Sequence, residues 1–511
     1  MFNTDSRKKN IMRNSLTSAT TGVINIGIQF LYRSFFLLLL TKEYLGIEGL
    51  FSNVIQLLSL AELGFGTVIA YRLYNPMEKH KITEVASIMN FYRKVYIIVA
   101  CVITFVGVSL LPVIHLFIKD SSEIPHDVNL HSVFLLFLAQ SVSSYFFTYK
   151  QAILVADQHN EIVAIFNTIS AAIKTALQLI VLLLTHNYQI QLFTAIIINM
   201  MLNWLFSLYI NNRYRNIFEY HTQISKDLKR KIYHDLRATL MHKIGGVIST
   251  STDNLILSAY IGLGTLGIYS NYTLIIEAVK KIIILLLGNH TASIGNARLQ
   301  MDDSSYYTFY EKLLLINFMI TNITSVCLFV LINPFICLWQ NKSMVFNVLE
   351  VGIIVACYYI NTIRLTNISF TNADGLYIKD IFRPLIENAI NLIISVYLAN
   401  KIGFKGVFIG TIVSNLTTVG WREPLILYRF SFHRNVFRYW TLYIKNTLLT
   451  LISCILLNYL LYNRISSYPL LLICSILVAM VTFLLTAFTF YNQITKPFIK
   501  KFVMLLHQHH L

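Results

Sequence analysis

The sequence reads Gly46-Ile47-Glu48-Gly49-Leu50-Phe51-Ser52-Asn53 and, 218 residues later, Gly264-Thr265-Leu266-Gly267-Ile268-Tyr269-Ser270-Asn271. Both octets follow one pattern, Gly-x-x-Gly-[Leu/Ile]-[Phe/Tyr]-Ser-Asn. A second echo, Ala156-Asp157 and Ala373-Asp374, recurs at an offset of 217 residues, so the two echoes together indicate an internal duplication. In each octet we expect the glycine pair to let the chain turn tightly between two helices, and Ser-Asn to cap the second helix.

The composition is that of a membrane protein. Of 511 residues, 56% are hydrophobic and only 13% are charged, against roughly 25% charged residues in soluble domains. The net charge of +17 does not imply a nucleic-acid partner, because a basic excess in a multi-pass protein usually marks cytoplasmic loops. The six cysteines lie in or beside apolar runs without Cys-x-x-Cys spacing, which favours buried thiols over a disulfide framework or a metal site. We therefore expect no metal and no cofactor.

Hydrophobic stretches of spanning length predict an all-α protein with about fourteen transmembrane helices. The predicted spans are 17–40, 50–70, 95–118, 131–154, 161–184, 190–210, 239–260, 268–289, 313–336, 346–370, 381–400, 405–428, 440–462 and 467–490. With the N-terminus inside, 30 of the 41 Lys and Arg fall on cytoplasmic segments, 6 on outer loops and 5 within spans. This asymmetry predicts that both termini are cytoplasmic.

The duplication predicts two six-helix lobes related by a pseudo-two-fold axis along the membrane normal, because six helices per repeat preserve the orientation. We place the N-lobe at 1–217, and the C-lobe at 218–430 with a cytoplasmic linker at 211–237. The last two helices and a cytoplasmic tail take up 431–511. The two lobes are expected to face each other across a central cavity.

Charged residues within the spans are candidates for function, since each costs at least about 2.5 kcal/mol near the bilayer centre. Three cations within the spans stand out, and two of them have polar neighbours in the same span. Two acids could couple transport to an ion or serve a structural role. The cation candidates and their polar neighbours are Arg33 with Asn25 and Gln29, Lys174 with Gln178, and Arg364; the acids are Asp253 and Glu62. Arg33 could instead be a structural partner of Glu62 or Asp253, and Glu62 could pair with a cation or cap a broken helix.

Motifs of several enzyme classes are absent from the sequence. There is no Gly-x-x-x-x-Gly-Lys-[Ser/Thr] loop, no His-Glu-x-x-His and no Gly-x-Ser-x-Gly. The predicted outer loops are also too short for an added domain. The sequence therefore favours a transporter over an enzyme.

Several segments together resemble the bacterial Wzx-type flippases of the multidrug/oligosaccharidyl-lipid/polysaccharide (MOP) superfamily. They are Lys9-Asn10-Ile11-Met12-Arg13-Asn14, Arg33, Tyr44–Asn53, Leu60-Ala61-Glu62-Leu63-Gly64-Phe65-Gly66, Leu73-Tyr74-Asn75-Pro76 and Ala156-Asp157-Gln158. The resemblance extends over the whole chain, and its most specific part is the region from Gly46 to Gly66.

The resemblance implies a flippase in the bacterial cytoplasmic membrane. Its substrate would be an undecaprenyl-pyrophosphate-linked oligosaccharide repeat unit, moved from the inner to the outer leaflet by alternating access for capsule, exopolysaccharide or O-antigen assembly. Membrane lipid, a polysaccharide polymerase and chain-length machinery are the implied partners. Arg33 fits the role of a pyrophosphate contact; Lys174 and Arg364 match no family motif. The last two helices would offer a groove to the lipid tail.

Three other functions remain open. A drug or cation antiporter of the same superfamily would depend on its embedded acids, although such transporters usually have twelve helices. A membrane glycan polymerase or glycosyltransferase would need a catalytic base near the outer surface. A structural lipid scramblase or partner protein would tolerate loss of every cavity charge.

Overall fold

The computed structural model describes residues 4–62, 64–220, 222–287, 291–380, 382–462 and 464–490. Within these ranges the chain forms helices and turns and contains no strand. The chain divides into two compact units, Met1–Gly267 (unit 1) and Ile268–Leu511 (unit 2), and each is described by itself. The predicted all-α architecture is therefore confirmed for the described residues.

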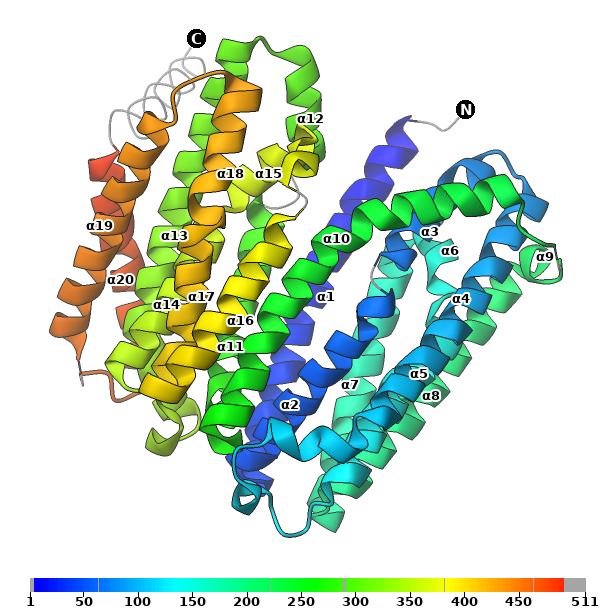
Figure 1. Ribbon diagram of the computed structural model, residues 1–511, viewed down its shortest axis with the longest axis horizontal. Coiled ribbons are helices and arrows are strands. Elements are labelled where there is room, and N and C mark those ends of the chain that lie inside the picture. The colour runs from blue at the N-terminus through cyan, green and yellow to red at the C-terminus, as the bar shows by residue number, and fades with distance from the viewer. Residues whose placement is uncertain are drawn as a thin grey trace. The chain divides into compact units, whose positions relative to one another are not determined.

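Unit 1 contains long helices linked by short ones (Figure 1). The α-helices are α1 (Thr4–Leu39), α2 (Lys42–Leu58), α3 (Phe65–Glu78), α4 (Ile82–Ser109), α5 (Leu130–Thr148), α6 (Gln151–Ala156), α7 (Asn160–Thr185), α8 (Tyr188–Arg213), α9 (Arg215–Phe218) and α10 (Lys226–Ile256). The 3₁₀ and π turns are η1 (Ser59–Glu62), η2 (Leu111–Phe117), η3 (Ser121–Glu123) and η4 (Leu257–Ile261). Helix α11 (Leu263–Leu287) begins in unit 1 and continues in unit 2.

Unit 2 is also built of helices, several of them interrupted. They are α12 (Thr291–Gln300), α13 (Asp303–Trp339), α14 (Val348–Ile363), α15 (Leu365–Ala373), α16 (Arg383–Ile402), α17 (Phe404–Thr417), α18 (Val419–Leu427), α19 (Phe437–Leu461) and α20 (Tyr468–Thr489). The short turns are η6 (Lys342–Met344), η7 (Leu376–Asp380) and η8 (Tyr428–Phe432).

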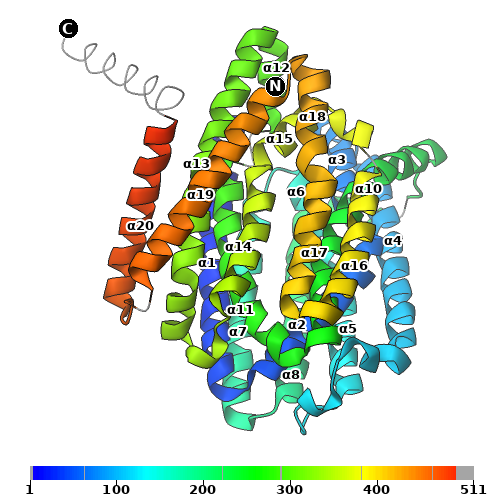
Figure 2. The same cartoon turned by 60° about the vertical axis from the view of Figure 1, so that its left-hand side comes forward.

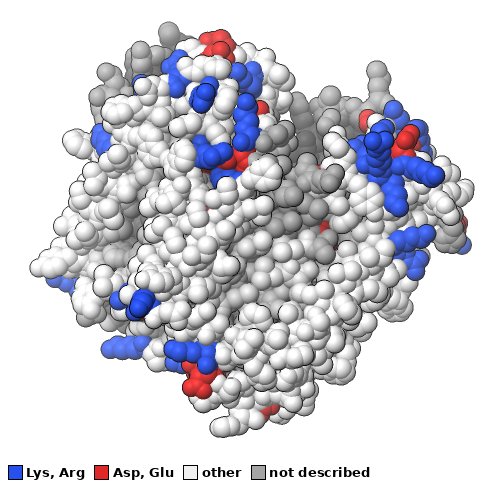
Figure 3. Space-filling view, in the orientation of Figure 1, with Lys and Arg blue, Asp and Glu red and all other residues white. Residues whose placement is uncertain are grey.

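Ten helical segments of the described residues are long and apolar enough to cross a membrane. They are Leu16–Leu39, Ile82–Ser109, Leu130–Thr148, Asn160–Thr185, Tyr188–Arg213, Asp303–Trp339, Val348–Ala373, Arg383–Ile402, Phe437–Leu461 and Tyr468–Thr489. Each overlaps a predicted span, so the protein is a multi-pass membrane protein. Over the face in Figure 3, charged residues gather mainly toward the helix ends of each unit and leave a broad uncharged surface between.

The other four predicted spans, 50–70, 239–260, 268–289 and 405–428, do not coincide with such a segment. Span 50–70 is interrupted, because α2 ends at Leu58 and Gly64 adopts a left-handed conformation (φ 95°) before α3 begins. Span 405–428 is divided between α17 and α18 at Thr418. The number of fourteen helices, the pseudo-two-fold axis and the cytoplasmic termini stay predictions.

The repeated octets lie inside helices, which corrects the role expected for their glycines. Gly46 and Gly49 belong to α2, and Gly264 and Gly267 to α11, all without a positive φ. Their purpose is close packing instead: a Cβ on Gly46 would lie 2.1 Å from the Leu263 carbonyl oxygen. A Cβ on Gly267 would likewise lie 2.0 Å from the Lys42 carbonyl oxygen, so the two octets meet backbone to backbone. Ser52-Asn53 and Ser270-Asn271 are helix-interior residues and cap nothing.

The second echo has the same local structure in both units. Asp157 follows α6 and Asp374 follows α15 as the residue that ends each short helix. Each carboxylate accepts a hydrogen bond at 2.7 Å from a tyrosine hydroxyl, Tyr214 for Asp157 and Tyr306 for Asp374. Burial raises the pKa of the Tyr214 hydroxyl, which keeps it protonated as the donor. The repeated Ala-Asp thus marks one structural device used twice.

Helix packing places the charged candidates. In unit 1, α1 packs along α7 and α7 along α8, so the helices that carry Arg33 and Lys174 are neighbours. In unit 2, α16 and α17 run side by side (Figure 2) because Gly406 and Gly410 bring the two backbones together. Helix α13 packs against α14, α19 and α20.

Helix α10 packs against α2 and α3 within unit 1. Asn254 donates to Asn53 at 3.1 Å, and Arg72 donates to Asp235 at 2.7 Å. The sequence placed this helix in the second lobe, whereas the compact units divide at Gly267. The boundaries 1–217, 218–430 and 431–511 stay predictions, and residues 491–511 lie outside the described residues.

Candidate functional site

A polar face runs along the apolar helix α1 of unit 1. Asn25 donates to the Thr168 hydroxyl of α7 at 2.9 Å, which ties the two helices together inside the span. Gln29, one turn on, is exposed, and Arg33 is half-buried one turn further. Asn25, Gln29 and Arg33 therefore lie on one face of α1, and part of that face is accessible.

Glu48 is the acid next to the unit 1 cations, and sequence reasoning missed it. It lies in α2, half-buried, and its carboxylate interacts electrostatically with both Arg33 and Lys174. The sequence assigned Glu48 to an outer loop because the octet was interpreted as a turn. One feature of the sequence could have indicated this. Glu48 lies between Gly46 and Gly49, so if the octet is read as part of a helix, Glu48 belongs to a packed helix and not to a loop.

Lys174 has no hydrogen bond and no ion pair within the described residues. It is half-buried on α7, and its interaction with Glu48 is electrostatic, without a hydrogen bond. Gln178, one turn further along α7, is buried with 7% of its surface exposed. An ammonium group without a contact partner in a membrane-spanning helix is costly, so this lysine needs a ligand or a function.

Buried oxygen atoms without a donor surround the same cluster. Oε1 of Gln191, the hydroxyl of Tyr188 and Oε2 of Glu48 have no hydrogen-bond partner among the described residues. Gln191 uses its amide nitrogen to donate to the Tyr32 hydroxyl at 3.1 Å, and both Tyr32 and Tyr188 interact electrostatically with Glu48. The site thus combines two cations with acceptors that a hydroxyl-rich ligand could satisfy.

Glu62 lies at the interruption between α2 and α3. Its carboxylate accepts a hydrogen bond from the Tyr96 hydroxyl, and Tyr92 in turn donates to Tyr96 at 2.7 Å. Tyr145 also interacts with it electrostatically. The helix is broken here, as one interpretation of the sequence expected, and tyrosines contact the acid.

Asp253 lies near the C-terminal end of α10 and is buried. Its neighbour Ser251 donates to Gln56 of α2 at 3.3 Å. This part of α10 therefore faces α2, whose other residues include Glu48. Asp253 stays a predicted ion-coupling or structural acid.

Arg364 of unit 2 forms a tightly paired group, which the sequence did not predict. Its Nε and Nη2 donate to the two oxygens of Glu423 at 2.9 and 2.7 Å, and Nη1 donates to Asn415 at 3.0 Å. Arg364 and Glu423 are both buried. Such a bidentate pair uses most of the donors of the guanidinium group, so the geometry favours a structural role over the predicted ligand contact.

No protein-family model matches the sequence, and the comparison with curated proteins finds no similar one. Solved structures do match. A lipid II flippase, MurJ, in an inward closed conformation superposes with a TM-score of 0.64 and 15% identity, over 94% of this chain and 98% of that one. The fold is that of MOP superfamily transporters.

Two further structures of that superfamily agree in fold. An inward-facing multidrug resistance MATE transporter matches with a TM-score of 0.59 and 14% identity, over 81% of this chain and 98% of that one. A MOP transporter from Pyrococcus furiosus, described as having a binding pocket of reverse polarity, matches with a TM-score of 0.51 and 15% identity, over 82% and 96%. These structural neighbours are transporters and a flippase, not enzymes.

Proposed function

We propose that this protein is a flippase for undecaprenyl-pyrophosphate-linked oligosaccharides in the bacterial cytoplasmic membrane. It would move each repeat unit from the inner to the outer leaflet by alternating access, with both termini cytoplasmic. The observation that supports this proposal most is the unpaired Lys174 ammonium beside Arg33 and Glu48 on helices of a MOP fold. A polysaccharide polymerase and chain-length machinery would act on the product.

The chemistry of the unit 1 cluster suits a pyrophosphate carrying sugars. A guanidinium binds two phosphate oxygens at once, and an ammonium supplies a compact second charge. The uncharged side chains Asn25, Gln29 and Gln178, together with the unpaired acceptor of Gln191, could hold sugar hydroxyls without selecting one sugar. Outward movement of negative charge also gains about 2.3 kcal/mol per charge per 100 mV of inside-negative potential.

We assign different roles to the remaining candidates. Arg364, paired with Glu423, would hold unit 2 together rather than touch the substrate. Asp253 and Glu62 are proposed as ion-coupling or structural acids. The groove that the resemblance assigns to the lipid tail, at the last two helices, has an apolar counterpart in a pocket of about 560 Å³ between α11, α13 and α20.

A drug or cation antiporter is the second candidate, because MATE transporters share the fold and Glu62 is an embedded acid without a described cation partner. This function requires the acids more than the cations. A Glu62→Gln variant that abolishes transport while Arg33→Ala retains it would favour the antiporter.

The test compares Arg33→Ala and Arg33→Lys in cells that lack the native copy, after equal membrane levels are confirmed. Surface polysaccharide and lipid-linked repeat units on the inner leaflet are measured together. We expect the alanine variant to lose polymer and accumulate repeat units, and the lysine variant to recover part of both. Arg464→Ala, which removes an exposed arginine, is the matched control. Normal polymer in both Arg33 variants would contradict the proposed contact.

A further inference from the structure

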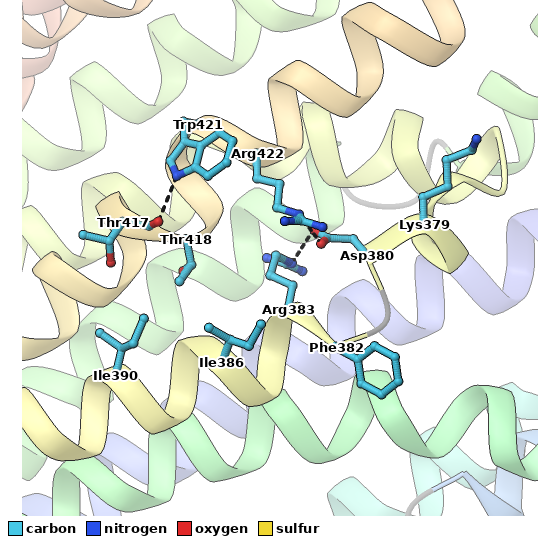
Figure 4. A pocket seen from close by; sticks show the side chains of 10 residues that line it. All are labelled: Lys379, Asp380, Phe382, Arg383, Ile386, Ile390, Thr417, Thr418, Trp421 and Arg422. Atoms are coloured by element: carbon cyan, nitrogen blue, oxygen red, sulfur yellow. Dashed lines mark hydrogen bonds and ion pairs between the residues drawn. The ribbon is translucent and has the colours of Figure 1, made fainter.

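A pocket of about 410 Å³ opens in unit 2 where α16 begins, and its far wall is formed by α17 and α18 (Figure 4). Lys379 and Asp380 lie just before the membrane-spanning segment Arg383–Ile402, so the pocket is at one membrane boundary. With the N-terminus inside, the predicted spans place segments 371–383 and 422–445, which contain Lys379 and Arg422, on the cytoplasmic side. The pocket belongs to unit 2, whereas the Arg33 cluster belongs to unit 1.

The acid that lines this pocket, Asp380, is paired with arginines at both carboxylate oxygens, although its Oδ1 makes no hydrogen bond within the described residues. Asp380 makes ion pairs with Arg422 through one oxygen and with Arg383, at 3.1 Å, through the other. Behind them, Glu423 binds Arg364 and also Arg383, at 3.0 Å. Figure 4 shows Arg422 and Arg383 converging on Asp380 from two different helices. The negative charges of these acids are therefore already balanced by arginines.

Cationic donors, in contrast, remain available. Arg422 contacts Asp380 through Nε, and 45% of its side chain is exposed, so its guanidinium group is accessible from the pocket. The Lys379 ammonium makes no ion pair there and lies 3.7 Å from the centre of the Phe430 ring. The groups that can still bind a ligand in this pocket are thus the guanidinium of Arg422 and the ammonium of Lys379, and both favour an anion.

The charge balance specifies what kind of anion. The network holds three arginines, Arg364, Arg383 and Arg422, against three acids, Asp380, Glu387 and Glu423. Among the residues that line the pocket, Lys379 adds one positive charge to this balanced network. A monoanion would balance this charge, whereas a multiply charged ligand would bring more negative charge than the lining side chains balance.

The walls below the cations are apolar and exposed. Phe382 and Ile386 on one side expose 67% and 53% of their surfaces, and Trp421 on the other exposes 45%. The Trp421 indole nitrogen is satisfied by the Thr417 carbonyl at 2.8 Å, so its ring presents an apolar face. Tryptophan at a membrane boundary is typical of the headgroup level.

We propose that this pocket binds the headgroup of a monoanionic phospholipid, with the phosphate on Arg422 and Lys379 and the glycerol and first acyl carbons against Trp421 and Ile386. Basic pockets between transmembrane helices on the cytoplasmic side bind lipid headgroups in this way. The ligand is a constituent of the surrounding bilayer, so the proposal does not depend on what the protein transports.

The test measures lipid retention by the purified full-length protein in detergent, by native mass spectrometry. Dioleoylphosphatidylglycerol is compared with dioleoylphosphatidylcholine, which has the same chains and a zwitterionic headgroup. We expect preferential retention of phosphatidylglycerol, reduced about fivefold by Lys379→Gln and by Arg422→Gln. Lys401→Gln and Arg464→Gln, each removing an exposed cation elsewhere, should have no effect.

Three results would overturn the proposal. They are equal retention of the two lipids by the unmodified protein, equal losses in the pocket and control variants, and displacement of phosphatidylglycerol by undecaprenyl pyrophosphate at equal concentration. The last result would assign the pocket to a lipid-linked pyrophosphate. Lys379→Gln keeps the test decisive if Arg422→Gln fails to fold, since Lys379 holds no ion pair within the described residues.

Discussion

Arg364 of unit 2 and Lys174 of unit 1 both lie in membrane-spanning segments, yet their surroundings differ. Arg364 is bound by both oxygens of Glu423 and by Asn415, and Arg383 joins the same acid. Lys174 makes no hydrogen bond or ion pair within the described residues and has only an electrostatic interaction with Glu48. Pairing offsets the free-energy cost of burying a charge, so the fold alone explains the paired arginine. The fold does not explain the unpaired lysine, and this difference distinguishes a structural charge from a charge available to a ligand.

The largest expected effect is a loss of stability when the paired Arg364 is replaced. Arg364→Met leaves Glu423 buried with one partner fewer, and we expect a loss of about 3–5 kcal/mol in the free energy of unfolding. Thermal unfolding of the purified protein in detergent measures it as a lowered midpoint. Lys401→Met, the loss of an exposed cation at the end of α16, is the control and should change the midpoint little.

A second substitution isolates the pair itself. Arg364→Met combined with Glu423→Leu removes both charges, and we expect it to recover at least half of the lost stability because no buried carboxylate is left unpaired. A single variant as stable as Lys401→Met would mean that the pair does not hold unit 2. Arg364 would then return as a candidate for the ligand site.

Packed and open surroundings also distinguish the glycines of unit 1. A Cβ at Gly46 meets the backbone of Leu263, whereas a Cβ at Gly27 of α1 has no described atom within 4 Å. We expect Gly46→Ala to destabilise the protein by about 1–3 kcal/mol and Gly27→Ala to leave it unchanged or slightly more stable. The measurement is again the unfolding midpoint, and equal midpoints would show that the two octets can separate without cost.

The sequence predicted the helical membrane fold well and the partners of its charges poorly. Apolar length and the placement of Lys and Arg are properties of local sequence, so ten predicted spans overlap observed ones. The duplication at Gly46 and Gly264 was visible, but its glycines were assigned to turns. A glycine that permits a turn and one that permits close packing look alike until the opposing backbone is known.

Long-range contacts explain the misassigned charges. Glu48 was placed in a loop, and the pairing of Arg364 with Glu423, 59 residues away, had no sequence signal. Arg33, Lys174, Asn25 and Gln29 could be selected because embedded polar residues are rare, whatever they touch. Which of them is paired depends on helix packing that no local pattern encodes.

Because Lys174 is unpaired, we expect its replacement to reduce transport without lowering the stability of the protein. Lys174→Met should reduce transport about tenfold, the loss expected for one charge-assisted hydrogen bond, while the unfolding midpoint stays close to that of the unmodified protein. Inner-leaflet repeat units and the midpoint are measured on the same preparation of membranes and protein. A lowered midpoint with unchanged transport would make Lys174 structural, like Arg364.

The smallest effect should come from Glu48→Gln, which removes the negative charge beside Arg33 and Lys174. With Glu48 ionised, Arg33, Lys174 and Glu48 together carry one net positive charge, and the substitution raises it to two. Loss of this carboxylate should tighten binding of undecaprenyl pyrophosphate by about 1 kcal/mol, roughly fivefold, in a competition assay on purified protein. Glu43→Gln in the first turn of the same helix is the control. Weaker binding would instead show that Glu48 holds the two cations in position, and its charge would then belong with the paired network rather than with the open site.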